Sequence, residues 1–230
     1  MIESQIKMIL WNVNGGGVEN KKNLDKKILI WALFADFVFL VEPWIEFNLN
    51  NESYISYSTE SVNGKLSVQL LIKEKLTSWL IKKNQIDTVL VEVLLEKNKI
   101  FLMNTYIHPS DKDRRTATWN NLISNIKEIL EEDPTAKIII AGDFNVNLLN
   151  YENKFCKKEW DLIKKLLTNA TIKTAKEWSF KHWWLEKEAK SLVDFLLFYN
   201  IENEIKIEEE ENSWPMSDHK LIKAAVSLKL

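Results

Sequence analysis

The sequence predicts a layered α/β or α+β domain, because short apolar runs of strand length alternate with longer amphipathic stretches. The chain has 230 residues, of which 46% are hydrophobic and 28% charged, and this composition can bury one sizeable core. It contains five glycines and four prolines, with no internal repeat and no Pro/Gly/Ser-rich linker. We therefore expect a single domain over residues 1–230 with short connections.

The first half of the chain predicts mainly strands. Residues 6–11 form an apolar run that ends at Asn12, and residues 36–41 form another that ends at Glu42. Between them, residues 24–33 carry apolar side chains at helical spacing. Further strands are expected at residues 54–58, 66–72, 88–95 and 100–106.

The second half adds the longest helix and the remaining strands. Residues 111–132 predict an amphipathic helix with Trp119, Leu122 and Ile126 on one side. The strand expected at residues 137–141 runs into Gly142-Asp143. A helix at residues 159–167 and strands at residues 192–198 and 221–228 complete the set, with the acidic run 208–211 as a solvated loop or sheet edge.

Charge and cysteine content exclude several classes. A net charge of −2 excludes a nucleic-acid partner held by bulk charge alone, so such a partner would need a local basic face. Candidates for that face are Lys181, His182, Lys187, Lys190 and Lys220. A single cysteine, Cys156, excludes a disulfide framework and favours a reducing, intracellular compartment. The longest apolar stretch, residues 28–41, is too short to span a bilayer, so we expect no membrane partner.

Polar side chains follow several of the predicted strands, where a sheet scaffold presents chemistry. They are Asn12, Glu42, Tyr106, Asp143 and His219. Asp143 and Asn145 are two residues apart, so on an extended segment their side chains share one surface. Taken singly, each motif also fits a turn or a solvated surface position.

Together these residues form six short blocks in a fixed order, and they resemble the endonuclease/exonuclease/phosphatase superfamily. That group holds pancreatic deoxyribonuclease, abasic-site repair endonucleases and neutral sphingomyelinases. The blocks are Trp11-Asn12-Val13-Asn14-Gly15, Glu42-Pro43, Thr105-Tyr106, Gly142-Asp143-Phe144-Asn145, Ser191-Leu192-Val193-Asp194 and Ser217-Asp218-His219. The resemblance spans nearly the whole chain and implies a four-layer αββα sandwich of two mixed sheets between outer helices.

The resemblance implies metal-assisted hydrolysis of a phosphodiester, with five catalytic residues. Asp143 would activate the attacking water, and Asn145 would position Asp143 or the phosphate. His219 would stabilise the charge that develops on the phosphate. Asp194 would hydrogen-bond to His219, and Tyr106 would lie near the leaving oxygen.

The resemblance also implies a metal site. Glu42 would hold Mg²⁺, with Mn²⁺ as an alternative, and Asn12 and Asp218 would complete or flank that site. No covalent intermediate is needed for this chemistry.

Three positions select one branch of the superfamily. Tyr106 stands where deoxyribonuclease, sphingomyelinase and inositol-phosphatase relatives tend to carry histidine. Ser191 stands where abasic-site repair enzymes carry tryptophan, and Asn14 where they usually carry aspartate. All three resemble the endonuclease domain of a retrotransposon that lacks long terminal repeats. We expect the substrate to be bound by Asn14, Ser191, Phe180 and Ser179.

The expected activity is nicking of one strand of duplex DNA to leave a 3′-hydroxyl. A reverse transcriptase domain on the same full-length polypeptide would use that end as a primer, and the point of action would be the nucleus. The alternatives are an abasic-site repair endonuclease and a phosphodiesterase acting on RNA or on a lipid or inositol phosphate. An alternative of another class is a catalytically silent binding module. A shifted register would let His108 replace Tyr106, although a loop position next to Pro109 is the preferred interpretation.

Overall fold

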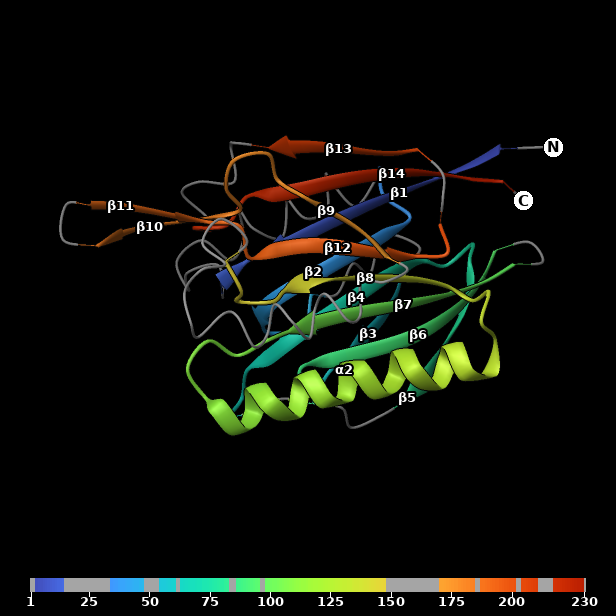
Figure 1. Ribbon diagram of the computed structural model, residues 1–230, viewed down its shortest axis with the longest axis horizontal. Helices are drawn as coiled ribbons and strands as arrows, with labels where there is room; N and C mark the ends of the chain where they lie inside the picture. Colours follow the sequence, from blue (N-terminus) through green and yellow to red (C-terminus); the bar gives the residue numbers. More distant parts are fainter. Residues whose placement is uncertain are drawn as a thin grey trace.

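The protein folds as a sandwich of two large sheets, seen in a computed structural model (Figure 1). The residues that the structure describes are 3–14, 34–47, 54–60, 63–82, 86–95, 98–147, 170–184, 187–201, 204–210 and 217–229. Within them, two six-stranded sheets and one two-stranded sheet are formed.

The first sheet has the strand order β13-β14-β1-β2-β4-β3. Its strands are β1 (Glu3–Asn12), β2 (Phe37–Trp44), β3 (Tyr54–Ser58), β4 (Leu66–Lys73), β13 (Ile205–Glu210) and β14 (Leu221–Lys229). β1 and β2 are parallel and the other pairings of this sheet are antiparallel.

The second sheet has the strand order β5-β6-β7-β8-β12-β9. Its strands are β5 (Thr77–Lys82), β6 (Thr88–Leu95), β7 (Asn98–Tyr106), β8 (Lys137–Asp143), β9 (Ala170–Thr174) and β12 (Asp194–Tyr199). β7 and β8 are parallel and the other pairings are antiparallel. A hairpin of β10 (Phe180–Trp184) and β11 (Lys187–Ser191) projects from one end of the sandwich, opposite the start of β1 (Figure 1).

The main core lies between the two sheets, where alternate residues such as Phe39, Leu102 and Ile139 are fully buried. One buried amide joins the sheets across this core. Asn104 Nδ2 on β7 donates to the carbonyl oxygens of Leu40 and Gln69, each at 2.9 Å.

A helix covers the outer face of the second sheet. α2 (Lys112–Glu132) begins at Asp111, whose side chain accepts a hydrogen bond from the Arg114 N–H. The helix buries Trp119, Leu122 and Ile126 against residues of β6, β7, β8 and β12. This packing matches the predicted apolar stripe.

The predicted sandwich of two mixed sheets is confirmed. The predicted helices at residues 24–33 and 159–167 lie outside the described residues. Strands β5, β9, β10, β11 and β13 were not predicted. Of the acidic run, residues 208–210 belong to β13, which is an edge strand of the first sheet.

Among the described residues, no helix is long and apolar enough to cross a membrane.

Candidate active site

Strand direction and register bring the predicted polar residues to one edge of the sandwich. β1 ends at Asn12, β7 at Tyr106 and β8 at Asp143. Tyr106 pairs with Asp143 in the parallel ladder, and Asp194 at the start of β12 pairs with Asp143 on the other side. Because the carboxyl ends of parallel strands meet the starting ends of antiparallel neighbours, these side chains converge.

Asn12 and Asp143 form the buried floor of the site. Asn12 Nδ2 donates to Glu42 Oε2 and to Asp143 Oδ2, each at 3.0 Å. Burial, and then the nearby charge of Asp194, raise the pKa of Asp143 to about 8, while His219 opposes this rise. A carboxylate with a pKa near neutral pH suits general-base catalysis.

Asp194 and His219 form a buried charged pair. His219 Nδ1 lies 2.7 Å from Asp194 Oδ2, with the two side chains 6% and 2% exposed. Burial disfavours the charged ring, but attraction to Asp194 and the hydrogen bond with it outweigh burial and raise the pKa of His219 to about 9. The ring is therefore an imidazolium at neutral pH, with Nε2–H as its second donor.

Phe180 and Asp218 flank this pair. The Phe180 ring lies 4.7 Å from the His219 ring between centroids, and the two residues form an isolated β-bridge. Asp218 Oδ1 is 3.8 Å from His219 Nε2 and accepts a hydrogen bond from Asn14 Nδ2 at 3.0 Å. Asn14 is exposed and Phe180 half-buried, so both lie where a substrate can reach them.

Tyr106 is a neutral phenol in this site. Burial, followed by the carboxylates of Glu42 and Asp143, raises the pKa of Tyr106 well above its usual value. Tyr106 ends β7 opposite Asp143, so the register keeps Tyr106 at the site and places His108 in the following loop.

Ser179 has a different environment from the predicted one. It is fully buried, and its Oγ accepts hydrogen bonds from the Val193 and Asp194 N–H groups, each at 2.9 Å. A hydroxyl enclosed in this way has no exposed surface with which to contact a substrate. Ser179 instead fixes the backbone of Asp194. Ser191 is half-buried and pairs with Phe180 at the base of the hairpin.

Two residues that hold the site had no predicted role there. Ser217 Oγ donates to the Asn12 carbonyl at 2.6 Å and accepts from the His219 N–H at 3.1 Å. Arg115 donates to the carbonyls of His108 and Asn145 at 3.0 and 3.2 Å. The contacts with the Asn12 and Asn145 carbonyls leave no local sequence signal, because they join segments far apart in the chain.

Asn145 orients Asp143 through its backbone. The Asn145 N–H donates to Asp143 Oδ1 at 2.8 Å, and its side-chain amide donates to the Ile107 carbonyl at 2.9 Å. Just before Asp143, a Cβ on Gly142 would lie 2.0 Å from the Thr105 carbonyl oxygen. Only glycine permits this close approach of β8 to β7 next to the Asp143 carboxylate.

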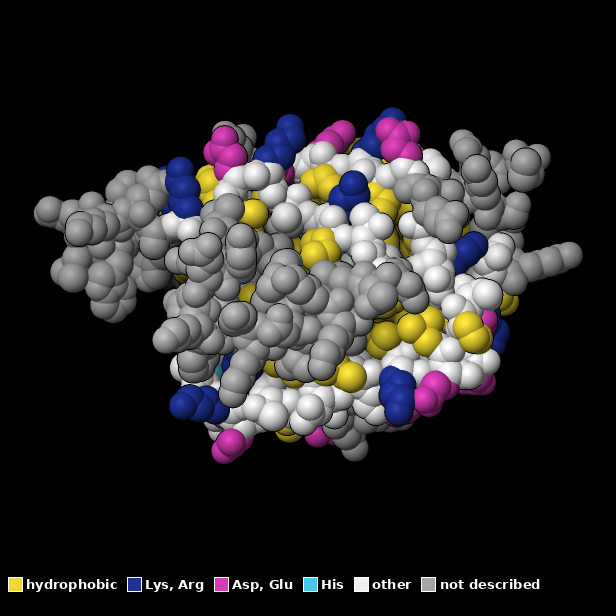
Figure 2. All heavy atoms as spheres, viewed as in Figure 1, with side chains coloured by type: hydrophobic (Ala, Val, Ile, Leu, Met, Phe, Trp, Pro, Cys, Tyr) yellow, Lys and Arg dark blue, Asp and Glu magenta, His cyan; other side chains and the backbone are white. Residues whose placement is uncertain are grey.

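One residue of the predicted basic face is buried. Lys220 is 3% exposed, its Nζ lies 2.8 Å from Glu209 Oε2 and 4.2 Å from the centroid of the Trp178 ring. It therefore belongs to the interior. Lys190 is exposed, whereas the side chains of His182 and Lys187 lie outside the described part of the chain. On the face seen in Figure 2, cationic and acidic side chains of the described residues are interspersed rather than gathered.

The buried acidic and histidine side chains fit a divalent metal ion. Asp143, Asp194 and His219 each place one nitrogen or oxygen atom within 4.8 Å of the others. Because a protonated His219 ring has no free lone pair, the carboxylate oxygens are the atoms that could bind the ion. Asp194 Oδ1 is buried and has no hydrogen-bond partner among the described residues, as expected for an oxygen that a cation would satisfy. The Asn12 amide donor that bridges Glu42 and Asp143 marks a second position where positive charge is favoured.

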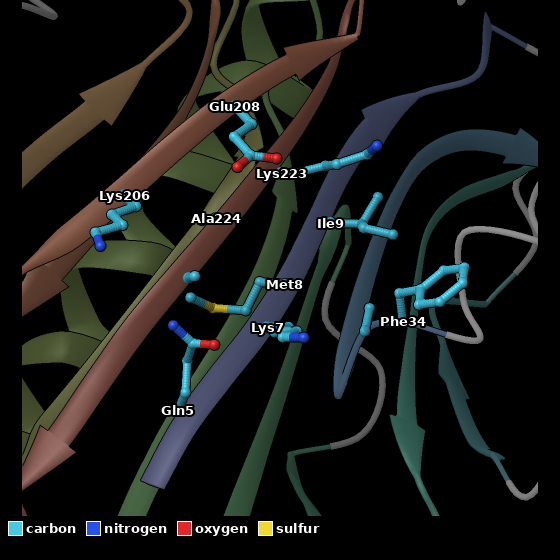
Figure 3. Close-up of a pocket in the computed structure, with 11 residues that line it drawn as sticks. Gln5, Lys7, Met8, Ile9, Phe34, Lys206, Glu208, Lys223 and Ala224 are labelled. Atoms are coloured by element: carbon cyan, nitrogen blue, oxygen red, sulfur yellow. The ribbon is translucent and has the colours of Figure 1, made fainter. Parts of the chain in front are cut away.

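A cavity of about 400 Å³ lies away from these residues, on the outer face of β13, β14 and β1 (Figure 3). Its lining includes Lys7, Phe34, Lys206 and Lys223, and none of its lining residues is a candidate catalytic residue. The candidate active site at the strand ends is therefore separate from this cavity.

Comparison with known proteins identifies the family. Residues 100–223, more than half of the chain, match the family described as endonuclease-reverse transcriptase. The chain belongs to this family. The match contains Tyr106, Asp143, Asp194 and His219, and it confirms the resemblance to retrotransposon endonucleases of the endonuclease/exonuclease/phosphatase superfamily. No curated protein matches the sequence.

Solved structures show the same fold at low sequence identity. The endonuclease domain of TRAS1, a telomere-specific non-LTR retrotransposon, has a TM-score of 0.73 and 14% identity, covering 98% of this chain and 100% of that chain. Truncated TDP2 from Caenorhabditis elegans has a TM-score of 0.72 and 16% identity, covering 97% and 98%. TDP2 from D. rerio, complexed with a single-strand DNA product, has a TM-score of 0.70 and 17% identity, covering 96% and 98%.

As a member of the endonuclease-reverse transcriptase family, the chain is a metal-dependent hydrolase that acts on phosphodiester bonds. This favours an enzyme over the alternative of a catalytically silent binding module.

Proposed function

We propose that this enzyme is a Mg²⁺-dependent endonuclease that nicks one strand of duplex DNA and leaves a 3′-hydroxyl. The observation that carries the proposal is the buried Asp194–His219 pair next to Asp143, at the edge where the strands end. A DNA substrate is supported by the TRAS1 endonuclease domain and by the D. rerio TDP2 complex with a DNA product, both of which share the fold.

In this proposal the chain's own groups perform the proton transfer and the charge stabilisation. Asp143, held by the Asn145 N–H, accepts the proton of the attacking water. The His219 imidazolium donates Nε2–H to a nonbridging phosphate oxygen and stabilises the negative charge that develops there. Asp194 fixes the tautomer and the charge of His219. The Tyr106 hydroxyl donates a hydrogen bond near the leaving oxygen.

Glu42 and Asn12 would hold the metal ion, with Asp218 at its edge. Carboxylate and amide oxygens are the ligands that Mg²⁺ prefers, and Mn²⁺ accepts the same donors. When bound, the ion supplies Lewis-acid neutralisation of the phosphate charge. Asn12 would offer its amide oxygen, which accepts a hydrogen bond from the Asn14 N–H at 2.9 Å.

The nick would prime reverse transcription. A 3′-hydroxyl on chromosomal DNA is the end that a reverse transcriptase extends, and the family description joins the two activities. We infer that a reverse transcriptase domain lies on the same full-length polypeptide and that the enzyme acts in the nucleus. Residues 1–230 would be its endonuclease domain.

The chemistry of the product ends tests this proposal. A labelled duplex is incubated with the enzyme and Mg²⁺, and the nicked strand is offered to a DNA polymerase without phosphatase treatment. We expect direct extension of the cut end on intact duplex. Cleavage confined to an abasic duplex would instead identify a repair endonuclease, and release of phosphate from inositol phosphates alone would identify a small-molecule phosphodiesterase.

A further inference from the structure

A second cavity, of about 290 Å³, opens next to the proposed metal site. Its lining includes Glu42 and Tyr106 from the site, and also Trp44, Lys65 and His108, which belong to none of the six motif blocks. Among the described residues that line it, Glu42 carries the sole carboxylate. The cavity is therefore continuous with the site but has its own set of side chains.

An unusual backbone segment joins the cavity to the site. Glu42 and Trp44, on either side of Pro43, have φ values of 48° and 57°, in the left-handed region that favours glycine. The register of β2 against β4 shifts between Val41 and Trp44, so that Trp44 pairs with Leu66. Strained backbone of this kind is concentrated at functional sites. Here it places Glu42 at the proposed metal site and Trp44 in the neighbouring cavity.

Lys65 is held over Trp44 in this cavity. Its Nζ lies 3.7 Å from the centroid of the Trp44 ring, a cation–π contact. The preceding turn, with φ values of 53° at Asn63 and 74° at Gly64, brings the chain back into β4 at this point. Lys65 remains exposed, so its ammonium group can meet an anion from solvent.

His108 supplies a neutral donor to the same cavity. Its Nδ1 accepts hydrogen bonds from the Ser110 and Asp111 N–H groups, at 3.3 and 3.0 Å. Because an accepting ring nitrogen carries no proton, the proton of this ring lies on Nε2. The ring packs edge-on against Tyr106, with 6.0 Å between centroids. The cavity thus combines one cation, one N–H donor and one aromatic face.

Arg114 forms the opposite wall and has its charge compensated. Its Nε and Nη2 donate to the two carboxylate oxygens of Asp87, and Nη2 also donates to Ser67 Oγ at 2.7 Å. This pair is built into the fold. Among the described residues that line the cavity, Lys65 therefore supplies the positive charge that has no carboxylate partner.

We propose that this cavity is a second phosphate subsite, which binds the phosphodiester next to the one that is cut. Lys65 Nζ and His108 Nε2–H donate to its nonbridging oxygens, and the intervening sugar packs against Trp44. The proposal rests on the proposed function, because Glu42 and Tyr106 line both sites. It makes the enzyme selective for a polynucleotide strand over any substrate with a single phosphodiester.

A chemical double-mutant cycle tests the subsite. Duplexes are prepared in which the phosphodiester immediately 5′ or 3′ of the cut bond is replaced by an uncharged methylphosphonate. kcat/KM is measured for each with the wild type and with Lys65→Ala. At one of the two positions, we expect the substitution to lower the wild-type value about tenfold and the Lys65→Ala value less than about twofold, because the two changes remove the same contact.

Two controls separate this contact from a general effect. Hydrolysis of bis(p-nitrophenyl) phosphate, which has no neighbouring phosphodiester, should be equal in the wild type and Lys65→Ala. Trp44→Ala should lower kcat/KM on DNA, whereas Trp79→Ala should not, since Trp79 is 40% exposed on β5 and does not line the cavity.

The outcomes distinguish the two proposals. In an enzyme that nicks DNA, the methylphosphonate could lower kcat/KM by the same factor in Lys65→Ala as in the wild type, at both positions. That result would overturn the subsite and leave the proposed function intact. A wild type that cuts no DNA would remove both.

Discussion

His219 Nδ1 lies 2.7 Å from Asp194 Oδ2, and both side chains are buried at the edge where the strands of the second sheet end. The pair turns a histidine into a lasting cation next to Asp143. A buried cation that is already paired needs little reorganisation when a phosphate gains charge, which is how electrostatic preorganisation lowers a barrier.

Replacing Asp194 with asparagine should remove that charge while keeping the side-chain shape. We expect Asp194→Asn to lower the pKa of His219 and to reduce kcat/KM at pH 8 by about 100-fold or more, because the phosphate meets a neutral ring. The His219 pKa can be followed by NMR of the ring nitrogens in both proteins. If the Asp194→Asn variant kept wild-type activity and an unchanged His219 pKa, the pair would have a structural role only.

The rate should depend on pH through two opposing groups. Burial raises the pKa of Asp143 to about 8, and Asp194 outweighs burial to raise the pKa of His219 to about 9. The active form requires ionised Asp143 and protonated His219. Its population should therefore rise as the pH passes the pKa of Asp143 and fall as the pH passes the pKa of His219. A bound divalent ion favours ionised Asp143 and moves the rising limb to lower pH.

A profile of kcat/KM from about pH 6 to about pH 10.5 checks this expectation. The falling limb should lie near pH 9 in the wild type and move to lower pH in Asp194→Asn. A rate that keeps rising to the alkaline end would show that protonated His219 is not required.

Ser179 should act by positioning Asp194. Its Oγ accepts two backbone N–H groups, so Ser179→Ala leaves two buried donors unpaired and should cost about 2–4 kcal/mol in the free energy of unfolding. We expect kcat to fall with little change in KM, and Ser179→Thr to restore much of it. Urea denaturation and steady-state kinetics on the two variants measure both effects. If Ser179→Ala changed KM alone, Ser179 would act in substrate binding and not in positioning Asp194.

The contact between Glu209 and Lys220 should make stability depend on acid. Burial opposes ionisation of Glu209, but hydrogen bonds from Lys220 and from the Lys176 N–H outweigh it and lower the pKa of Glu209. Because the pKa of Glu209 is lower in the folded state, the ionised side chain stabilises the protein at pH values above its pKa in the unfolded chain, about 4.3. This stabilisation is lost as the pH falls through the pKa of Glu209 in the folded state.

Glu209→Gln should therefore lower the free energy of unfolding by about 1–2 kcal/mol at pH 7 and by much less below about pH 4. Glu208→Gln, at the exposed neighbour on the same strand, is the matched control and should have little effect. Equal losses for Glu209→Gln at both pH values would contradict the charged contact.

The sequence predicted the ends of the central strands well because the signal of a buried strand is local. Asn12, Tyr106 and Asp143 each end an apolar strand, and strand order then brings them together. Central strands are buried on both faces, so their apolar runs are easily recognised.

The missed elements lie at edges, where burial is partial. β5 and β13 are edge strands, and β13 carries Lys206 and Glu208 between partly buried residues, so its apolar pattern is weak. The burial of Ser179 could not be predicted from the sequence for another reason. Its sequence neighbours, Trp178 and Phe180, are partly exposed, and only the tertiary fold turns its hydroxyl toward the Asp194 backbone.

Relaxation of supercoiled plasmid tests the central claim most directly. The wild type, Asp143→Asn and His219→Ala are incubated with plasmid and Mg²⁺, with and without chelator, after circular dichroism has shown that all three are folded. We expect nicked circles from the wild type that depend on the metal ion, and a loss of at least about 1,000-fold in each variant. Nicking that survives chelator or survives Asp143→Asn would contradict it.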